Sequence, residues 1–203
     1  TLTTTLVRDA RLEVQEHREQ TQKEQARQQQ DLDVEQALVG DLHRLEAALE
    51  RMYRDLSAWY RVHDVTLTRG EQKEHEVTAV ELLQVIEGAL SEEVSGSGLQ
   101  LPAVMRMLLT VEVELDPDDL EEKDTASTRL AELLSLLHRF RDDAALALVF
   151  GRTGDSPRVT THLLDPGVVA GPVLSEVHGS VLMSGTLYPP KMYSDLLTMP
   201  DER

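Results

Sequence analysis

A short stretch near the end of the sequence, GSVLMSGTLYPP (residues 179–190), contains the side chains whose types and spacing best suit chemistry. Three apolar residues run directly into Ser184, Gly185 and Thr186. Two short hydroxyl side chains beside a glycine can exchange hydrogen-bond partners with little steric hindrance. When a buried strand of a nucleotide-binding α/β domain ends in this way, its hydroxyls lie at the carboxyl edge of the sheet, where ligands bind. A hydroxyl-capped turn between a strand and a helix has the same composition, so the tripeptide alone leaves both interpretations open.

The other residues that could bind a ligand are scattered along the chain. Glu71 and His75 are four residues apart and could place two metal ligands on one helix face, but no third ligand lies near them in the sequence. A solvated polar face explains this pair more simply, so we predict no metal site. No glycine-rich phosphate loop of either common type is present. We therefore expect this chain alone to bind no nucleotide and no other cofactor.

Three residues are candidates for contacts with a nucleic-acid strand. Tyr60 and Arg61 directly follow Trp59, which continues an apolar seam and is expected in the core. Tyr60 and Arg61 should point elsewhere, where they could stack on a base and pair with a phosphate. Arg106 is a further candidate for a phosphate contact. The other arginines considered for a locally basic edge are Arg69, Arg139 and Arg141.

The composition sets limits on these sites. Hydrophobic residues make up 40% of the 203 residues and aromatic residues only 3%, so the core must be built from Leu, Val and Ala, which favours helices. A formal net charge of −17 opposes binding to nucleic acid and to anionic membranes. Nucleic-acid binding by such a chain would therefore need either a locally basic edge that faces the strand or other domains that grip it. Acid excess, scarce lysine and small apolar side chains are typical of proteins kept soluble in concentrated salt, so we expect a halophilic source.

The composition also indicates the cellular compartment in which the protein is expected. The chain has no cysteine, which excludes disulfides and thiolate metal sites within it. It has no apolar run of the roughly 20 residues that span a bilayer, and its first residues lack a signal-peptide layout. We expect a cytoplasmic protein with no membrane contact. The sequence begins without Met and already in helical rhythm, as an excised piece of a longer protein would.

Periodicity predicts a mainly α fold in which antiparallel helices precede a small α/β piece. A first helix begins near Leu2, and its polar second half, EHREQTQKEQARQQQ, should project into solvent. A second helix carries a heptad seam, and two long helices with a short link should pack antiparallel. The seam residues are Leu38, Leu42, Leu45, Leu49, Met52, Leu56, Trp59 and His63.

Later segments change from helical to strand patterning. Three further helices are expected over residues 80–94, from Pro102 through AVMRMLLTV, and over residues 130–140. An apolar run (144–150), the turn residues GRTGDSPR and a β-branched run (159–164) predict a hairpin. A short helix near GPVLSEVH and a buried strand over residues 180–183 should follow. The predicted domains are a helical block, residues 1–143, and an α/β segment, residues 144–203.

The segment from Leu163 to Leu197 resembles the part of the XPD family of DNA repair helicases that ends in helicase motif III. The similarity covers about 35 residues and follows the family's spacing. Its elements are LDP at 164–166, PV at 172–173, SGTL at 184–187, Pro189, and Tyr193 ahead of the leucines at 196–197. The upstream hairpin also resembles the family, and WYRVHDV (59–65) is similar to a Trp-Arg-Val-rich segment there. The helical block otherwise matches only in pattern.

The resemblance implies that residues 1–143 are the Arch domain and residues 144–203 return into the first RecA-like helicase domain. The whole protein would be a superfamily 2, ATP-dependent DNA helicase of nucleotide excision repair, moving five-prime to three-prime with single-stranded DNA threaded beneath the Arch. Ser184, Gly185 and Thr186 would form motif III, which couples the nucleotide state to the grip on DNA. Protein partners on the Arch are also implied, and together with the halophilic composition the resemblance implies a halophilic archaeon as the source.

The same resemblance places the cofactors outside this chain. ATP, Mg and a four-iron, four-sulfur (4Fe-4S) cluster would be bound by a phosphate loop, four cysteines and an Asp-Glu-Ala-His box encoded upstream. The chain alone is then not expected to be catalytically active. The alternative function is a free-standing helical interaction module that dimerises or docks through the heptad face from Leu38 to Trp59.

Overall fold

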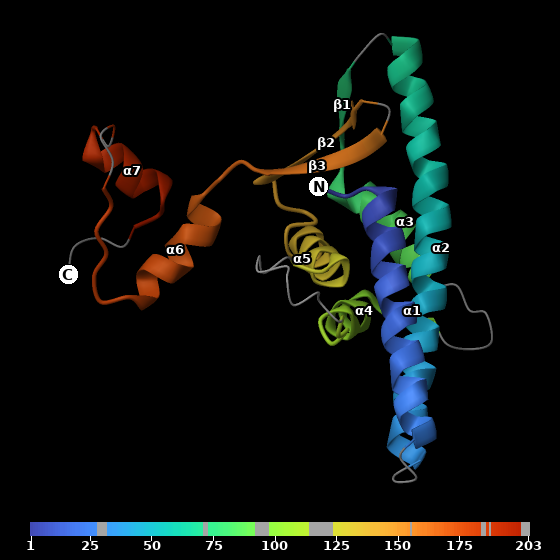
Figure 1. Cartoon of the computed structure of the whole chain (residues 1–203). Helices are drawn as coiled ribbons and strands as arrows, with labels where there is room; N and C mark the ends of the chain where they lie inside the picture. Colours follow the sequence, from blue (N-terminus) through green and yellow to red (C-terminus); the bar gives the residue numbers. More distant parts are fainter. Residues whose placement is uncertain are drawn as a thin grey trace.

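The computed structural model describes residues 1–27, 32–70, 73–91, 98–113, 124–154, 156–183, 186 and 188–199, without the side chains of residues 25, 27, 32–35 and 68–70. The fold is mainly α with one small antiparallel sheet, as predicted (Figure 1). The helices are α1 (Thr4–Arg27), α2 (Leu32–Gly70), α3 (Ala79–Ser91), α4 (Leu101–Leu108), α5 (Ala126–Arg139), α6 (Gly167–Glu176) and α7 (Pro190–Leu196). The strands are β1 (Glu74–Val77), β2 (Leu146–Thr153) and β3 (Ser156–Leu163).

Helices α1 and α2 lie side by side and antiparallel, which confirms the predicted helical pair (Figure 1). The buried seam of α2 agrees with the predicted one from Leu42 to Leu56, but then it continues through Tyr60 and Leu67. Of the predicted members at its two ends, Leu38 is exposed, which contradicts the prediction, whereas Trp59 is partly buried against the core and His63 is half-buried. An α-helix turns every 3.6 residues, so over several heptads the buried stripe drifts away from a 3.5-residue repeat.

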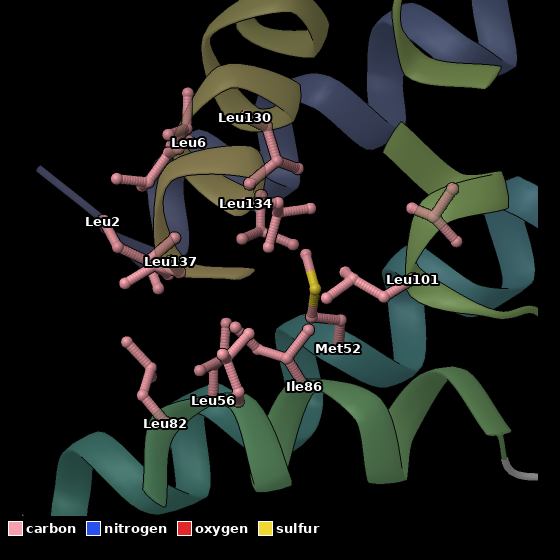
Figure 2. Packing of buried hydrophobic residues seen from close by; sticks show 14 of the residues in the cluster. Leu2, Leu6, Met52, Leu56, Leu82, Ile86, Leu101, Leu130, Leu134 and Leu137 are labelled. Atoms are coloured by element: carbon pink, nitrogen blue, oxygen red, sulfur yellow. The ribbon is translucent and has the colours of Figure 1, made fainter. Parts of the chain in front are cut away.

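The second half of α1 projects from the body of the molecule, as predicted. After Val14, none of the described α1 side chains is buried. Figure 1 shows this part of the α1–α2 pair extending beyond α4 and α5. The core lies at the other end, where Leu2 and α1 to α5 all contribute leucines (Figure 2).

Helix α5 is anchored to α1 at its first turn. The carboxylate of Glu13 accepts hydrogen bonds from the backbone N–H groups of Ala126 (2.8 Å) and Ser127 (2.7 Å). The Thr125 hydroxyl accepts a third from the Thr128 N–H, at 3.2 Å. These acceptors satisfy amide groups that a helix leaves free at its start, and the negative charge lies at the positive end of the helix dipole.

The sheet has the order β1-β2-β3, with both pairs antiparallel. Strands β2 and β3 form the predicted hairpin, and Gly154 adopts the positive φ of 58° that its tight turn requires. Strand β1 was not predicted, because the charged sequence EHEV has no apolar alternation. The side chains of Leu148, Phe150 and Val159 belong to the same hydrophobic cluster as the helices. The domain division after residue 143 stays a prediction, but the hairpin shares the helical core.

The C-terminal helices α6 and α7 lie to one side of the core in Figure 1, and α6 touches the core through Val168. The buried strand predicted over residues 180–183 was wrong. These four residues are irregular and exposed, since none of the described strands lies beside them to supply hydrogen-bond partners. Of the helices in the described residues, none combines the length and apolar character that crossing a membrane requires.

Candidate functional site

The predicted chemical site lies in the exposed stretch between α6 and α7. Ser184 and Gly185 fall outside the described residues, so their geometry is not tested. Thr186 is exposed, and its backbone carbonyl accepts hydrogen bonds from the Tyr188 N–H (2.8 Å) and the Tyr193 hydroxyl (2.9 Å). Tyr193 belongs to α7, so the turn at Thr186 is attached to that helix.

Two of the apolar residues that lead into this site, and a tyrosine beyond it, are the most exposed large hydrophobic side chains of the described chain. Val181 is 83% exposed and Met183 is 87% exposed, and Tyr188 on the far side of the tripeptide is 84% exposed. A soluble domain rarely leaves such residues together in water. The described apolar residues of this stretch, 181–183 and 188, therefore have the composition of a buried element and the exposure of a surface loop.

Helix α6 is positioned by its small residues. Asp165, in the LDP element, accepts a hydrogen bond from the Gly167 N–H (2.8 Å) and so helps to begin the helix. A Cβ atom on Gly167 would lie only 2.4 Å from Oγ1 of Thr198, and one on Gly171 would lie 3.1 Å from Cβ of Thr198. The two glycines therefore let α6 pack closely against the segment that follows α7.

The opposite character appears on another stripe of α6. Val169 and Val173 are four residues apart on α6 and are both exposed, and Val177, the residue that follows the helix, is exposed as well. Residues at this spacing lie along one face of a helix. The two glycines thus face Thr198, in the segment after α7, while Val169 and Val173 form an exposed apolar face of α6.

The predicted DNA contact of Tyr60 was wrong for this structure. Its ring is 2% exposed and packs edge-on against Phe150, with ring centroids 5.4 Å apart. Its hydroxyl donates a hydrogen bond to the backbone carbonyl of Leu2 (2.8 Å). Burial raises the pKa of Tyr60, which keeps the phenol protonated and able to donate. No face of the ring is open to a base.

Arg61 remains available on the surface. Its Nε donates to the backbone carbonyl of Ser57 (3.2 Å), and the guanidinium borders a depression of about 500 Å³ that Tyr53 and Asp64 also line. Arg141 is engaged elsewhere, in an ion pair with Glu87 (3.0 Å). The side chain of Arg69 lies outside the described part of the chain.

Arg106 and Arg139 come together, which the sequence did not predict. Both line a groove of about 650 Å³ between α4 and α5, with Val169 of α6 at its edge. The Arg139 guanidinium lies 5.1 Å from the ring centroid of Phe140. Within the described residues, neither arginine forms an ion pair with a carboxylate.

The structure also joins two histidines that the sequence did not pair. His63 of α2 and His75 of β1 are 12 residues apart and place ring nitrogens 2.7 Å from each other. The other ring nitrogen of His63 lies 3.2 Å from a Glu81 carboxylate oxygen. His63 closes the predicted seam and His75 alternates with glutamates in EHEV, which is the one sequence signal for an inward-facing strand histidine.

Metal binding has no support in this geometry. Among the described residues, no group of three or more His, Cys, Asp or Glu side chains is arranged to hold an ion. The proposed partner of His75, Glu71, falls outside those residues.

Comparisons with protein-family profiles, curated proteins and solved structures find no match to this chain.

Proposed function

We propose that this chain is the Arch and motif III portion of an XPD-type, ATP-dependent DNA helicase of nucleotide excision repair. The observation that carries the proposal is the exposed apolar run into Ser184, Gly185 and Thr186. The sequence of this run resembles a central helicase strand, and its most exposed members, Val181 and Met183, have no sheet partner among the described strands.

The physical argument concerns what would cover these side chains. Strands of a parallel sheet in an α/β domain are buried on both faces and are apolar along their whole length. Burying one Val or Met side chain contributes about 1.5–3 kcal/mol. A strand 181–183 paired within a larger sheet would gain this for each residue, as would the uncovered valine face of α6. The remainder of a RecA-like helicase domain is the partner that the resemblance supplies.

The helical block supports the proposal by its shape. The long α1–α2 pair extends from a core that also holds the β2–β3 hairpin, so the helices are fixed to the segment that leads toward residues 184–186. An arch over a DNA path needs such a rigid connection to the motor domain. The groove with Arg106 and Arg139 offers this arch a locally basic surface despite the net charge of −17.

The coupling role follows from the chemistry of the tripeptide. The Thr186 backbone is held to α7 through the Tyr193 hydroxyl, so a change of hydrogen-bond partner at residues 184–186 would be transmitted to that helix. Exchanging hydroxyl partners has a small net energy, about 1 kcal/mol for each hydrogen bond, which suits a contact that must reverse in every cycle.

The implied cofactors do not fit residues of this chain. The sequence has no cysteine to hold an iron–sulfur cluster and no phosphate loop to hold ATP. We therefore assign ATP, Mg and the cluster to other parts of the protein and derive no step through them here. A cytoplasmic location and single-stranded DNA as the nucleic-acid partner belong to the same proposal.

Substituting Thr186→Ala in the full-length protein tests the coupling role. ATP binding and DNA-stimulated hydrolysis should stay near their original values, while strand unwinding falls by about tenfold, the equivalent of about 1.4 kcal/mol. Ser194→Ala is the matched control. It removes a hydroxyl from the neighbouring helix α7, and that hydroxyl makes no hydrogen bond within the described residues. Equal loss of hydrolysis and unwinding, or a similar loss in the control, would count against motif III.

The alternative is a helical interaction module that dimerises through the face from Leu38 to Trp59. The described structure already buries most of that face, from Leu42 to Leu56, in the chain's own core. We therefore rank this alternative second. Sedimentation separates the two, because a stable dimer that persists at micromolar dilution favours the module.

A further inference from the structure

The histidine pair, His63 and His75, connects three elements at one end of the core. His63 lies on α2, His75 on the edge strand β1, and Glu81 on α3. The ring nitrogens Nδ1 of His63 and Nε2 of His75 are 2.7 Å apart, and the two rings meet edge to edge, with centroids 5.0 Å apart and planes 21° from parallel. This contact therefore ties the short strand to the two helices behind it.

Apolar and aromatic groups surround the histidine pair. The ring of Phe150 lies with its centroid 5.3 Å from each imidazole, and the ring of Trp59 lies 3.9 Å from that of His63. Nδ1 of His75 is buried without a hydrogen-bond partner among the described residues. Water is therefore poorly placed to stabilise an added charge on His75.

The hydrogen-bond partners determine where the protons lie. Glu81 accepts from the Trp59 indole N–H (3.2 Å) and faces Nε2 of His63 (3.2 Å), so that nitrogen must be the protonated one when His63 is neutral. Nδ1 of His63 is then a lone pair, and Nε2 of His75 must donate to it. This assignment leaves Nδ1 of His75 as the unprotonated, buried nitrogen.

The arrangement accepts one proton but not two. A first proton is bound by the pair as a whole: one bare nitrogen stays in the 2.7 Å contact, Nδ1 of His75 gains an N–H, and the Glu81 carboxylate lies beside the resulting single charge. A second proton would leave an N–H group on both nitrogens of the 2.7 Å contact, with two positive charges side by side. One carboxylate can compensate only one of these charges.

The other charged groups nearby do not help the histidine pair to bind a second proton. Asp64 of α2 is paired with Arg152 of β2 through two contacts of 2.6 Å. On β1, Glu74 and Glu76 flank His75 and alternate to the opposite side of the strand, and Glu74 packs over Gly151. Glu81 is thus the one carboxylate of the described residues in contact with the histidine pair.

The geometry also distinguishes proton binding from metal binding. His75 and Glu81 contact opposite nitrogens of the His63 ring, so the three donors do not converge on one point. A metal ion needs convergent ligands. A shared proton needs only one donor nitrogen facing one acceptor nitrogen, as Nε2 of His75 and Nδ1 of His63 do here.

We propose that the histidine pair is a pH-sensitive latch, which holds β1 against α2 and α3 with one proton or none and releases the strand when both histidines are protonated. The inference does not depend on the helicase proposal. Strand β1 is the element to be released because it has only four residues and lies at the sheet edge, paired with β2 alone.

The direction of the pH effect follows from His75. Burial, and then the charge of His63, lower the pKa of His75, while Glu81 opposes this shift. The released state then binds more protons than the latched state, so the latch weakens as the pH falls below the ordinary histidine value of about 6.5. One extra proton bound on release changes the opening equilibrium about tenfold per pH unit between the two pKa values.

Amide hydrogen exchange of the chain between pH 7.5 and pH 5 tests the latch. After correction for intrinsic exchange, opening of β1 should increase by up to about tenfold per pH unit below pH 6.5, while the buried middle of α2 stays protected. His75→Phe should abolish the increase, because the ring remains against Phe150 without a titrating group. His43→Gln is the matched control, since His43 is an exposed histidine on the same helix, and it should behave like the original protein.

Glu81→Gln keeps the experiment decisive if His75→Phe does not fold. Glu81 compensates the positive charge of the singly protonated histidine pair. Without this carboxylate the charged pair is less stable, so β1 should open at a higher pH than in the original protein. A Nitrogen-15 spectrum of the original protein should also show both histidines protonated at Nε2 near pH 7.5. An unchanged pH profile in His75→Phe or Glu81→Gln would overturn the latch, as would parallel loss of protection in α2 or protection of β1 by added Zn²⁺.

Discussion

Tyr60 provides the sharpest test of the core, because the sequence predicted a DNA contact for it and the structure gives it a packing role. The substitution Tyr60→Phe removes only the hydroxyl that donates to the Leu2 carbonyl (2.8 Å). The ring contacts with Phe150 and Trp59 remain. The change therefore isolates one buried hydrogen bond between α2 and the segment before α1.

The expected magnitude depends on what happens to the abandoned carbonyl. A buried acceptor left without any partner costs about 1–3 kcal/mol, whereas the net loss of an ordinary hydrogen bond is about 1 kcal/mol. The Leu2 carbonyl also accepts from the Val159 N–H at 3.0 Å, so it keeps one partner. We therefore expect a decrease in the free energy of unfolding of about 1 kcal/mol.

Urea unfolding measures this decrease. With a slope of about 2 kcal/mol/M, the midpoint should fall by about 0.5 M. Tyr53→Phe is the control, because Tyr53 lies on the same helix, is only partly buried and has no hydrogen-bond partner within the described residues. It should leave the midpoint unchanged.

Alkaline pH gives a second readout of the same substitution. Because burial raises the pKa of folded Tyr60 above that of the unfolded chain, its contribution to stability is present below pH 10 and is lost as the pH rises further. Tyr60→Phe should remove this part of the alkaline loss. If the variant instead kept full stability and lost affinity for single-stranded DNA, the assignment of Tyr60 to the core would be refuted.

Two further substitutions test the contacts that position the elements. Glu13→Gln replaces the carboxylate that caps α5 and should lower the free energy of unfolding by about 1 kcal/mol in urea, whereas the exposed Glu16→Gln on the same helix should not. Gly167→Ala would place a Cβ 2.4 Å from Oγ1 of Thr198 and 2.8 Å from the Leu196 carbonyl, so α6 should separate from the end of the chain and become faster to cleave by protease. Gly179→Ala, with no atom within 4 Å of its Cβ, is the control, and equal cleavage of both variants would show that the α6 contact is unimportant.

Local sequence patterns correctly predicted the elements that bury their apolar side chains against other described parts of this chain. The spacing of Leu42 to Leu56 predicted the buried face of α2, and turn residues around Gly154 predicted the β2–β3 hairpin. Strand β1 was missed because it is held by β2 and by the histidine pair, neither of which its own sequence reveals. Long-range pairing selects such a short charged strand more than propensity does.

The errors at the sites have related causes. Tyr60 was expected on the surface but is buried beside the partly buried Trp59, because the buried stripe of a 3.6-residue helix drifts from a strict heptad and comes to include both neighbours. The strand over residues 180–183 was predicted from apolar residues, but apolar residues form a strand only beside another strand. The pairings of His63 with His75 and of Arg106 with Arg139 join different elements, so sequence spacing could not show them.

The proposal of DNA binding can be compared with the distribution of charge over the described residues. Most arginines with a defined partner serve the fold, as in the pairs of Arg18 with Glu46 and Arg152 with Asp64. Arg106 and Arg139 differ, because they flank one apolar groove without a carboxylate partner in the described residues, although Glu132 also lines it. In a chain with 37 acidic and 20 basic residues, uncompensated positive charge is concentrated at few points. Since phosphate contacts require such charge, the α4–α5 groove is a better candidate than the surface around Tyr60 for a locally basic edge, and the other expectation, that domains outside this chain grip the DNA, stays open beside it.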